Sequence, residues 1–461
     1  MGDSLPNIIW LTVDSIRADH TSVNNYSRDT TPNLERIAES SSSVSFNNCI
    51  SEGIWSLPVG TSILTGTYPN YHNTVCEGDM VPDDLKTLPE LFGEVGYETY
   101  GVSGNPWFSD ATGMNRGFDH FEYISKSNLT AAGIMPFARF ILGLKRHSAG
   151  YTLDTSAHFT DFIALEAVKE WVDTTSSSEN PSFIYAHTEG AHTPYCPPMK
   201  NLKLFSDDVD MSPSEILDFS KYVGKNIHKL ISEEVDFTKE EQDALGVAYD
   251  ALIHYLDSRI GSVYDKIKKS DIKPTILVIT SDHGDLLGEN GLLSHKISLH
   301  SGITRVPMVI HGVDLDKKDS LVQHVDVVKE VARRAGVSHP QFQGKLIGDR
   351  DYSLTHRSEG YFNTTTEIIS QYNADFDTSQ FHTKDTNSLV KSGYKLVKSS
   401  DKEKLYDLPN EESECEDNDV RIQLRDELAR AVSELSRDSQ TDQRAEFGDQ
   451  VKQQLSDLGY M

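Results

Sequence analysis

The chain has 461 residues, of which 37% are hydrophobic, and this allows a substantial core divided over two or three domains. Its formal net charge is −28, because 43 Lys and Arg residues stand against 71 Asp and Glu residues. Such an excess of acid argues against non-specific binding to nucleic acid and against docking on an anionic membrane. It suits either a protein kept soluble in concentrated salt or an ordinary acidic cytosolic protein.

The cysteines and the N-terminus narrow the class of protein further. The four cysteines are scattered without a C-x-x-C pair, which favours neither a disulfide framework nor a structural zinc site. No signal peptide or twin-arginine segment precedes the first apolar run, and no apolar run reaches the ~20 residues that a membrane helix needs. We therefore expect a cytoplasmic protein without a transmembrane segment.

Residues 7–14 form the first predicted element, a short apolar run that ends in Asp14, as expected of a strand buried in a parallel sheet. A helix is predicted over residues 30–39, with a threonine as cap and a proline at an early helical position. Residues 44–46 predict a further strand. The chain thus begins with strands and helices in alternation.

Residues 54–66 predict a helix that starts near Ser56 and that Gly66 closes. A serine in the first helical turn meets free backbone N–H groups and the positive end of the helix dipole. This environment favours a bound ester oxygen or the serine alkoxide itself. Taken alone, the pattern is more often a simple N-cap. A cation held within reach of Ser56 would reverse that preference.

The middle of the chain predicts several more elements. An amphipathic helix is expected over residues 85–97, strands over 99–103 and 182–187, and rim helices and loops over 199–243. Residues 129–146 are apolar but too short to span a bilayer. We expect them to pack against the sheet. A lid over a greasy substrate, or an interfacial helix in peripheral membrane contact, is the less favoured alternative.

Residues 248–264 predict a helix that leads into an apolar strand over residues 275–280. A Ser-Asp-His-Gly turn follows, so Asp282 and His283 lie at the carboxyl end of a central strand, where open α/β sheets bind their ligands. A solvated strand-to-loop turn is the simpler alternative. Because Asp14 ends a similar strand, the two strands would bring the three side chains together as ligands for one divalent cation. Strands that alternate with helices over this length imply a doubly wound α/β sheet.

A set of motifs recurs in order from residue 7 to about residue 408. It comprises residues 7–17, Ser-Leu-Pro-Val-Gly from Ser56, Thr-Ser-Asp-His-Gly-Asp-Leu-Leu-Gly-Glu at 280–289, Gly-Leu-Leu-Ser-His-Lys at 291–296, Thr-Arg-Val-Pro at 304–307 and the paired segments within 394–408. Together these motifs resemble the sulfatase family of the alkaline phosphatase superfamily.

The resemblance implies an alkaline phosphatase-like α/β fold, in which a large mixed, mostly parallel sheet lies between helical layers. Residues 1–345 would form the sulfatase-like catalytic domain, and residues 346–410 a small C-terminal α+β subdomain with antiparallel strands. Residues 411–461 would form an acidic loop and a C-terminal helix. This helix would either pack on the body or serve as an interaction tail.

The resemblance also implies a metal-dependent nucleophile. Asp14, Asp282 and His283 match metal ligands, and Ser56 matches a nucleophile that itself touches the metal. One divalent ion is implied. Family habit favours Ca²⁺, the imidazole favours Mn²⁺, and Mg²⁺ or Zn²⁺ remain alternatives.

Further residues match positions around the ester group. His192 and His295 match the histidines that hold the ester and protonate the leaving oxygen, although a lone loop histidine is usually only solvated. Lys296 and Asn105 are, with His192, the candidate substrate-binding residues. The expected partner is a small-molecule, glycan or lipid-linked ester, and no nucleic acid.

Three departures from the sulfatase pattern bear on the chemistry. The C/S-x-P-x-R motif that is matured to formylglycine has Gly60 in place of its arginine, Ser15 replaces a second acid, and residues 101–107 lack the lysine and histidine near the sulfate. The remaining set is similar to that of lipoteichoic acid synthases and other phosphoglycerol transferases. We therefore favour phosphodiester or phosphoglycerol-type chemistry by unmodified Ser56. Sulfate ester hydrolysis on a sulfated glycan or small molecule is the near-equal alternative, and a non-catalytic binding protein is the third.

Overall fold

The computed structural model describes residues 5–125, 128–149, 160–270, 272, 274–315, 317–437, 444–449, 451–452 and 455. Its largest element is an eight-stranded sheet with the strand order β10-β2-β9-β6-β1-β5-β3-β4. In this order the strands are Leu321–Val322, Ser43–Ile50, Arg305–His311, Thr275–Thr280, Asn7–Val13, Ser182–Thr188, Glu98–Ser103 and His120–Tyr123. Only β9 runs antiparallel to its neighbours among these strands, so the predicted large, mostly parallel sheet is confirmed.

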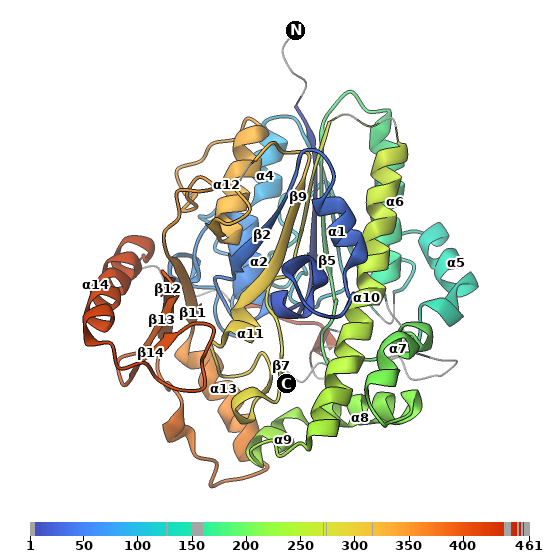
Figure 1. Cartoon of the computed structure of the whole chain (residues 1–461). Helices are drawn as coiled ribbons and strands as arrows, with labels where there is room; N and C mark the ends of the chain where they lie inside the picture. Colours follow the sequence, from blue (N-terminus) through green and yellow to red (C-terminus); the bar gives the residue numbers. More distant parts are fainter. Residues whose placement is uncertain are drawn as a thin grey trace.

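Helices cover both faces of this sheet (Figure 1). One face carries α1 (Pro32–Ala38), α6 (Asp161–Ser176) and the long α10 (Lys239–Lys269). The other face carries α2 (Ser56–Thr65), α4 (Leu88–Glu94) and α12 (His324–Arg334). Further helices surround these layers: α3 (Pro69–His72), α5 (Ile134–Leu142), α7 (Met199–Phe205), α8 (Pro213–Lys225), α9 (Ile227–Ser232), α11 (Ser301–Thr304) and α13 (Glu359–Ser370). The strands β7 (Leu286–Leu287) and β8 (Leu293–Ser294) form a separate hairpin.

The three central strands end at the same edge of the sheet. Every residue of β1 and β5 is buried, as the apolar composition of strands covered on both faces requires. Thr12 of β1 pairs with His187 of β5 and with Thr280 of β6. Asp14 and Asp282 each lie two residues beyond these pairs, so parallel pairing alone places the two acids at one edge.

Local signals predicted some helix boundaries better than others. Gly66 ends α2 with φ +69°, a left-handed conformation that glycine adopts without strain. Thr31 occupies the N-cap position of α1 but makes no capping bond with its side chain, which accepts the N–H of Val23 instead. The helix predicted over residues 85–97 is shorter, because the capping box of Thr87 starts α4 only at Leu88.

The apolar segment 129–146 differs from its expected packing. Its helix α5 packs mainly on α6, which in turn packs on β3 and β5. Ile134 and Leu142 are 77% and 89% exposed. Within the part of the chain that the structure describes, no helix is both long and apolar enough to cross a membrane.

A second, four-stranded antiparallel sheet follows the large one, as predicted. Its strands are β11 (Ser353–Arg357), β12 (Thr386–Lys391), β13 (Tyr394–Lys398) and β14 (Glu403–Asp407). The C-terminal helix α14 (Asn418–Leu435) packs on this sheet through Leu424 and Leu428, at the left of Figure 1. The helix therefore packs on the body of the protein along this face.

A buried ion pair joins α12 to the segment before β11. Arg350 Nη2 donates to Asp326 Oδ1 at 2.6 Å, and Nη1 donates to the Tyr352 carbonyl oxygen at 3.1 Å. Arg350→Ala is expected to lower the free energy of unfolding by about 3–5 kcal/mol, since the Asp326 carboxylate would stay buried without its cation. Urea denaturation measures this change. The exposed Arg333→Ala variant is the control and should cost less than about 1 kcal/mol.

Candidate active site

The predicted metal ligands and nucleophile converge at the carboxyl edge of the large sheet. Ser56 Oγ lies 3.2 Å from Asp14 Oδ2 and 3.4 Å from His283 Nε2. His283 Nε2 lies 3.3 Å from Asp14 Oδ1 and 3.7 Å from Asp282 Oδ2. All four side chains are buried. Two strands and one helix from distant parts of the chain thus bring together the set that the sequence indicated.

Ser56 is the first residue of α2 and not its N-cap. Trp55 occupies the cap position in an extended conformation, and all ten residues of the helix are buried. The Trp55 ring stacks on Tyr361 with ring centroids 4.7 Å apart and packs edge-on against Trp107 at 5.1 Å. This aromatic packing holds the start of the helix in place, so the serine hydroxyl points at the acids.

Asn105, predicted from the sequence as a substrate-binding residue, lies beside Ser56. Its Nδ2 donates to Asp14 Oδ2 at 2.9 Å and to Ser56 Oγ at 3.1 Å, while its Oδ1 accepts the Trp107 N–H at 2.9 Å. The last bond fixes which end of the amide faces the serine. Asn105 can therefore stabilise negative charge on the serine oxygen or on an ester oxygen next to it.

His187 belongs to the same cluster, although the sequence analysis assigned it no role. Its Nε2 lies 3.5 Å from Asp282 Oδ2, and neither atom has a hydrogen-bond partner among the described residues. Asp14, His187 and Asp282 offer ligand atoms that all lie within 4.8 Å of one another. In the sequence, His187 could have been recognised by its position near the end of a strand that neighbours β1. Two unpaired buried polar atoms in a set of oxygen and nitrogen donors fit a divalent cation.

The pKa shifts of the clustered side chains agree with binding of a divalent cation. Burial, and next the charge of Asp282, raise the pKa of Asp14 well above its usual value. Burial lowers the pKa of His187 to about 4, which keeps this imidazole neutral, the form that binds metals. Two facing carboxylates in a dry site repel each other, and a cation would relieve that repulsion.

Asp285 is a second residue that the sequence analysis did not assign. Its Oδ1 lies 2.9 Å from His295 Nδ1, and its Oδ2 accepts the hydroxyl of Tyr195 at 3.0 Å. The ring of His295 lies 4.4 Å from that of His283 and 5.3 Å from that of His192. Asp285 thus orients His295 toward the cluster, as a carboxylate commonly does for a catalytic imidazole.

Burial shifts the pKa of both candidate proton donors in the same direction. Burial lowers the pKa of His192 to about 3 and that of His295 well below its usual value. His192 Nδ1 donates to the Thr193 carbonyl oxygen at 2.8 Å. A bound anion would raise both pKa values, because it would stabilise the charged imidazole.

Lys296 supplies a positive charge to this end of the site. Burial lowers its pKa to about 8, although Glu77 and Asp285 oppose the shift. Burial also raises the pKa of Glu77 to about 7. Glu77 follows α3 and was not expected at the site. A largely protonated lysine and a weakly acidic glutamate leave this region able to accept an anion.

Gly60, which stands in place of the arginine of the sulfatase motif, lies against the ring of Phe108. A Cβ atom at this position would lie 2.2 Å from Cζ of Phe108, so a side chain at residue 60 would require the Phe108 ring to move. The ring of Phe108 therefore occupies the space next to α2 one turn after Ser56.

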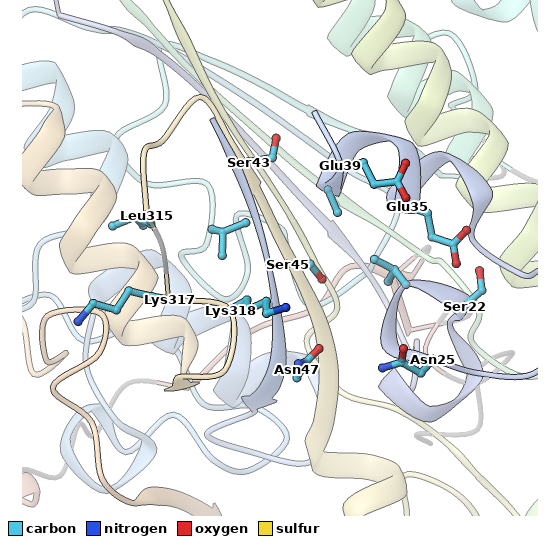
Figure 2. Close-up of a pocket in the computed structure, with 13 residues that line it drawn as sticks. Ser22, Asn25, Glu35, Glu39, Ser43, Ser45, Asn47, Leu315, Lys317 and Lys318 are labelled. Atoms are coloured by element: carbon cyan, nitrogen blue, oxygen red, sulfur yellow. The ribbon is translucent and has the colours of Figure 1, made fainter. Parts of the chain in front are cut away.

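A surface hollow of about 550 Å³ lies away from these residues (Figure 2). Glu35 of α1 and Glu39, which follows that helix, lie on one side of it, and Lys317 and Lys318 on the other. None of the candidate catalytic residues lines it. The hollow is therefore separate from the cluster at the carboxyl edge of the sheet.

Comparisons with known proteins show what the chain is similar to. Residues 6–337 match the family model described as Sulfatase. A sulfatase of Formosa agariphila is 24% identical over 456 residues, which cover 93% of this chain and 86% of that protein. An N-acetylglucosamine-6-O-sulfatase of Bacteroides thetaiotaomicron is 22% identical over 399 residues, with 73% and 68% covered.

Solved structures share the fold. The phosphonate monoester hydrolase of Agrobacterium radiobacter superposes with a TM-score of 0.69 at 17% identity, covering 93% of this chain and 96% of that one. A structure in complex with its substrate D-glucosamine-2-N,6-O-disulfate superposes with a TM-score of 0.64 at 18% identity, covering 94% and 97%.

Proposed function

The chain belongs to the sulfatase family, and from this premise we propose that it is a metal-dependent hydrolase of sulfate monoesters with Ser56 as nucleophile. The observation that carries the proposal is the convergence of Ser56 Oγ with Asp14, Asn105 and His283. Phosphoglycerol transfer, which the sequence analysis favoured, finds no support among the relatives, and we do not propose it.

A sulfated saccharide is the substrate class that we propose. The support comes from curated relatives named N-acetylglucosamine-6-O-sulfatase, Delta 4,5-hexuronate-2-O-sulfatase and Ulvan-active sulfatase. The buried cationic Lys296 and the amide of Asn105 suit a sulfate group. The exposed acidic surface of the chain would require this local positive charge to attract an anionic sugar.

The residues of the site suggest a two-step reaction. Asp14, Asp282 and His283 would hold a divalent ion, which would neutralise negative charge on the ester and on the serine oxygen. Ser56 Oγ, whose hydroxyl donates to Asp14, attacks the sulfur, so that the Oγ–S bond forms and the bond to the leaving oxygen breaks. His295, oriented by Asp285, or His192 donates a proton to the leaving oxygen. Water then hydrolyses the serine ester and releases sulfate.

A second candidate function is hydrolysis of phosphonate or phosphate esters. It is favoured by Gly60 and Phe108, which leave no room for the motif arginine and so point to an unmodified serine hydroxyl. Structural similarity to phosphonate monoester hydrolases of Agrobacterium radiobacter and Silicibacter pomeroyi supports it, the latter with a TM-score of 0.70 at 16% identity over 96% of this chain and 99% of that one.

Matched aryl esters distinguish these functions. An aryl sulfate, an aryl phosphonate monoester and a phosphodiester would be compared with added Mn²⁺, Ca²⁺ or chelator, and peptide mass spectrometry would report whether Ser56 is modified. We expect metal-dependent release of sulfate and an unmodified serine. A higher kcat/KM for the phosphorus esters would establish the second candidate. Turnover of none of them by metal-loaded protein would leave the non-catalytic alternative.

The pH profile should report on Lys296. Its charged form attracts the anionic ester, so KM is expected to rise by up to about tenfold per pH unit above pH 8, as the lysine loses its proton. Lys296→Arg should keep the cation, because arginine has a pKa above about 12, and should move this limb to higher pH. A wild-type profile that stays flat to pH 10 would rule out this role.

A further inference from the structure

His187 lacks a hydrogen bond at the nitrogen that faces the site. Its Nε2 and the Oδ2 of Asp282 are both buried, 3.5 Å apart, and without a hydrogen-bond partner in the described part of the chain. Leaving such a group unsatisfied costs about 1–3 kcal/mol. An ordinary core histidine would satisfy both ring nitrogens, so this pair indicates a ligand between the two atoms.

The opposite side of the same ring is held firmly. His187 Nδ1 lies 3.3 Å from the hydroxyl of Tyr185, which in turn lies 3.4 Å from Thr12 Oγ1. Trp10 Nε1 donates to that threonine oxygen at 3.1 Å. This chain of contacts runs along β1 and β5 and fixes the direction of Nε2. Outer partners of this kind commonly set the orientation of histidines that bind metals.

Phe108 covers the face of the ring. Its ring stacks on that of His187 with centroids 3.9 Å apart and planes inclined by 25°. The Phe108 N–H donates to the Asn105 carbonyl oxygen at 3.0 Å, so the same turn carries the residue that contacts the nucleophile. Phe108 reaches this place only because residue 60 has no Cβ, since that atom would lie 2.2 Å from its ring.

We propose that His187 is a further ligand of the divalent ion, positioned by Phe108 in the space that Gly60 leaves, and that it makes the site prefer Mn²⁺ or Zn²⁺ over Ca²⁺. The loss of the motif arginine and the placement of this imidazole are then one coupled change. Imidazole nitrogen favours transition-metal ions, whereas Ca²⁺ favours oxygen. With His187 and His283, two imidazoles would join the carboxylates of Asp14 and Asp282. This inference rests on the divalent ion of the proposed function.

The first test measures metal binding and not activity. Metal-free protein would be titrated calorimetrically with Mn²⁺, Zn²⁺ and Ca²⁺, and Co²⁺ would serve as a spectroscopic probe. We expect His187→Ala to lower the affinity for Mn²⁺ by roughly 100-fold or more, beyond the 10–100-fold typical of outer partners, and the affinity for Ca²⁺ by much less. The visible bands of bound Co²⁺ should change in the same variant. His187→Gln, checked by circular dichroism, keeps the test valid if the alanine variant does not fold.

The chain offers a closely matched control in His147. This histidine is also buried and stacks on Phe162 with centroids 3.9 Å apart at 25°, and its Nδ1 lies 3.0 Å from the hydroxyl of Tyr255. Because it has the same aromatic and hydroxyl partners but lies outside the cluster, His147→Ala should cost stability and leave the metal affinities and the Co²⁺ spectrum unchanged.

The second test concerns positioning by Phe108. Phe108→Leu keeps apolar volume but loses the flat stack, and should lower Mn²⁺ affinity about 10-fold and reduce the preference for Mn²⁺ over Ca²⁺. Gly60→Ala, which displaces the ring, should act in the same direction. A purely structural role would lower the melting temperature equally with and without metal and leave the preference unchanged.

The outcomes separate the two proposals. If wild type binds Mn²⁺ and His187→Ala binds it with the same affinity and the same Co²⁺ spectrum, the inference is wrong while the proposed function stands. If wild type binds none of these ions, the divalent ion of the proposed function is itself wrong.

Discussion

Replacing Ser56 with alanine is expected to lower kcat by at least about 10⁴-fold, the loss seen when a nucleophile is removed from a preorganised site. Its hydroxyl oxygen is the atom on which Asp14, Asn105 and His283 converge, and no other hydroxyl is placed in that way among the contacts of the described residues. The change removes one small oxygen from a fully buried helix start, so the fold should persist. Steady-state hydrolysis of the preferred aryl ester measures the loss.

Ser62→Ala provides the matched control for this variant. Ser62 is also buried on α2, but its hydroxyl lies 3.1 Å from Nε2 of His72 and not at the cluster. We expect its kcat to stay within a few-fold of wild type. A Ser56→Ala protein that keeps one tenth of the wild-type rate would show that another group attacks the ester.

Removing the divalent ion is expected to lower activity by at least about 10³-fold, because stabilisation of charge at the reacting centre usually contributes most to the rate of such reactions. Activity lost to a chelator should return when Mn²⁺ is added. Asp282→Asn should show a comparable loss without chelator, since its Oδ2 lies at the centre of the cluster beside His187 and His283. Inductively coupled plasma mass spectrometry of the purified variant measures the retained metal.

Asp257→Asn is the control for removal of a buried acid. Asp257 accepts hydrogen bonds from the backbone N–H groups of Asn33 and Leu34 at the start of α1, at 2.9 Å each, and not from the cluster. The variant should lose stability but keep its metal and its chelator-sensitive activity. Full activity of wild type in chelator, with no metal detected, would contradict the metal-dependent mechanism.

The sequence alone was sufficient for the features that depend on neighbours along the chain. Apolar runs that end in an acid predicted β1 and β6, because strands buried on both faces need apolar residues throughout and parallel strands end at one edge. Ser56 and Gly66 marked the start and the end of α2 through helix-terminus chemistry. The family motifs then predicted that Asp14, Asp282 and His283 bind one cation.

Residues that act through space were beyond such patterns. His187 and Asp285 carried no periodic or capping signal, and their place beside the cluster follows from the pairing of β1 with β5 and from the packing around His295. Burial also lowers the pKa of both candidate proton donors, because the pKa of an imidazole depends on its surroundings and not on its neighbours in sequence.

Gly60 shows most clearly the difference between what the residue pattern predicts and what depends on contacts in the folded protein. That the motif arginine is missing is evident from the sequence, since this is a matter of residue identity. Which side chain takes its place became known from the fold, because Phe108 comes from a turn after another strand and meets α2 through packing. Close packing fills the space next to a glycine with whatever side chain the fold brings there, and that choice depends on contacts between distant segments.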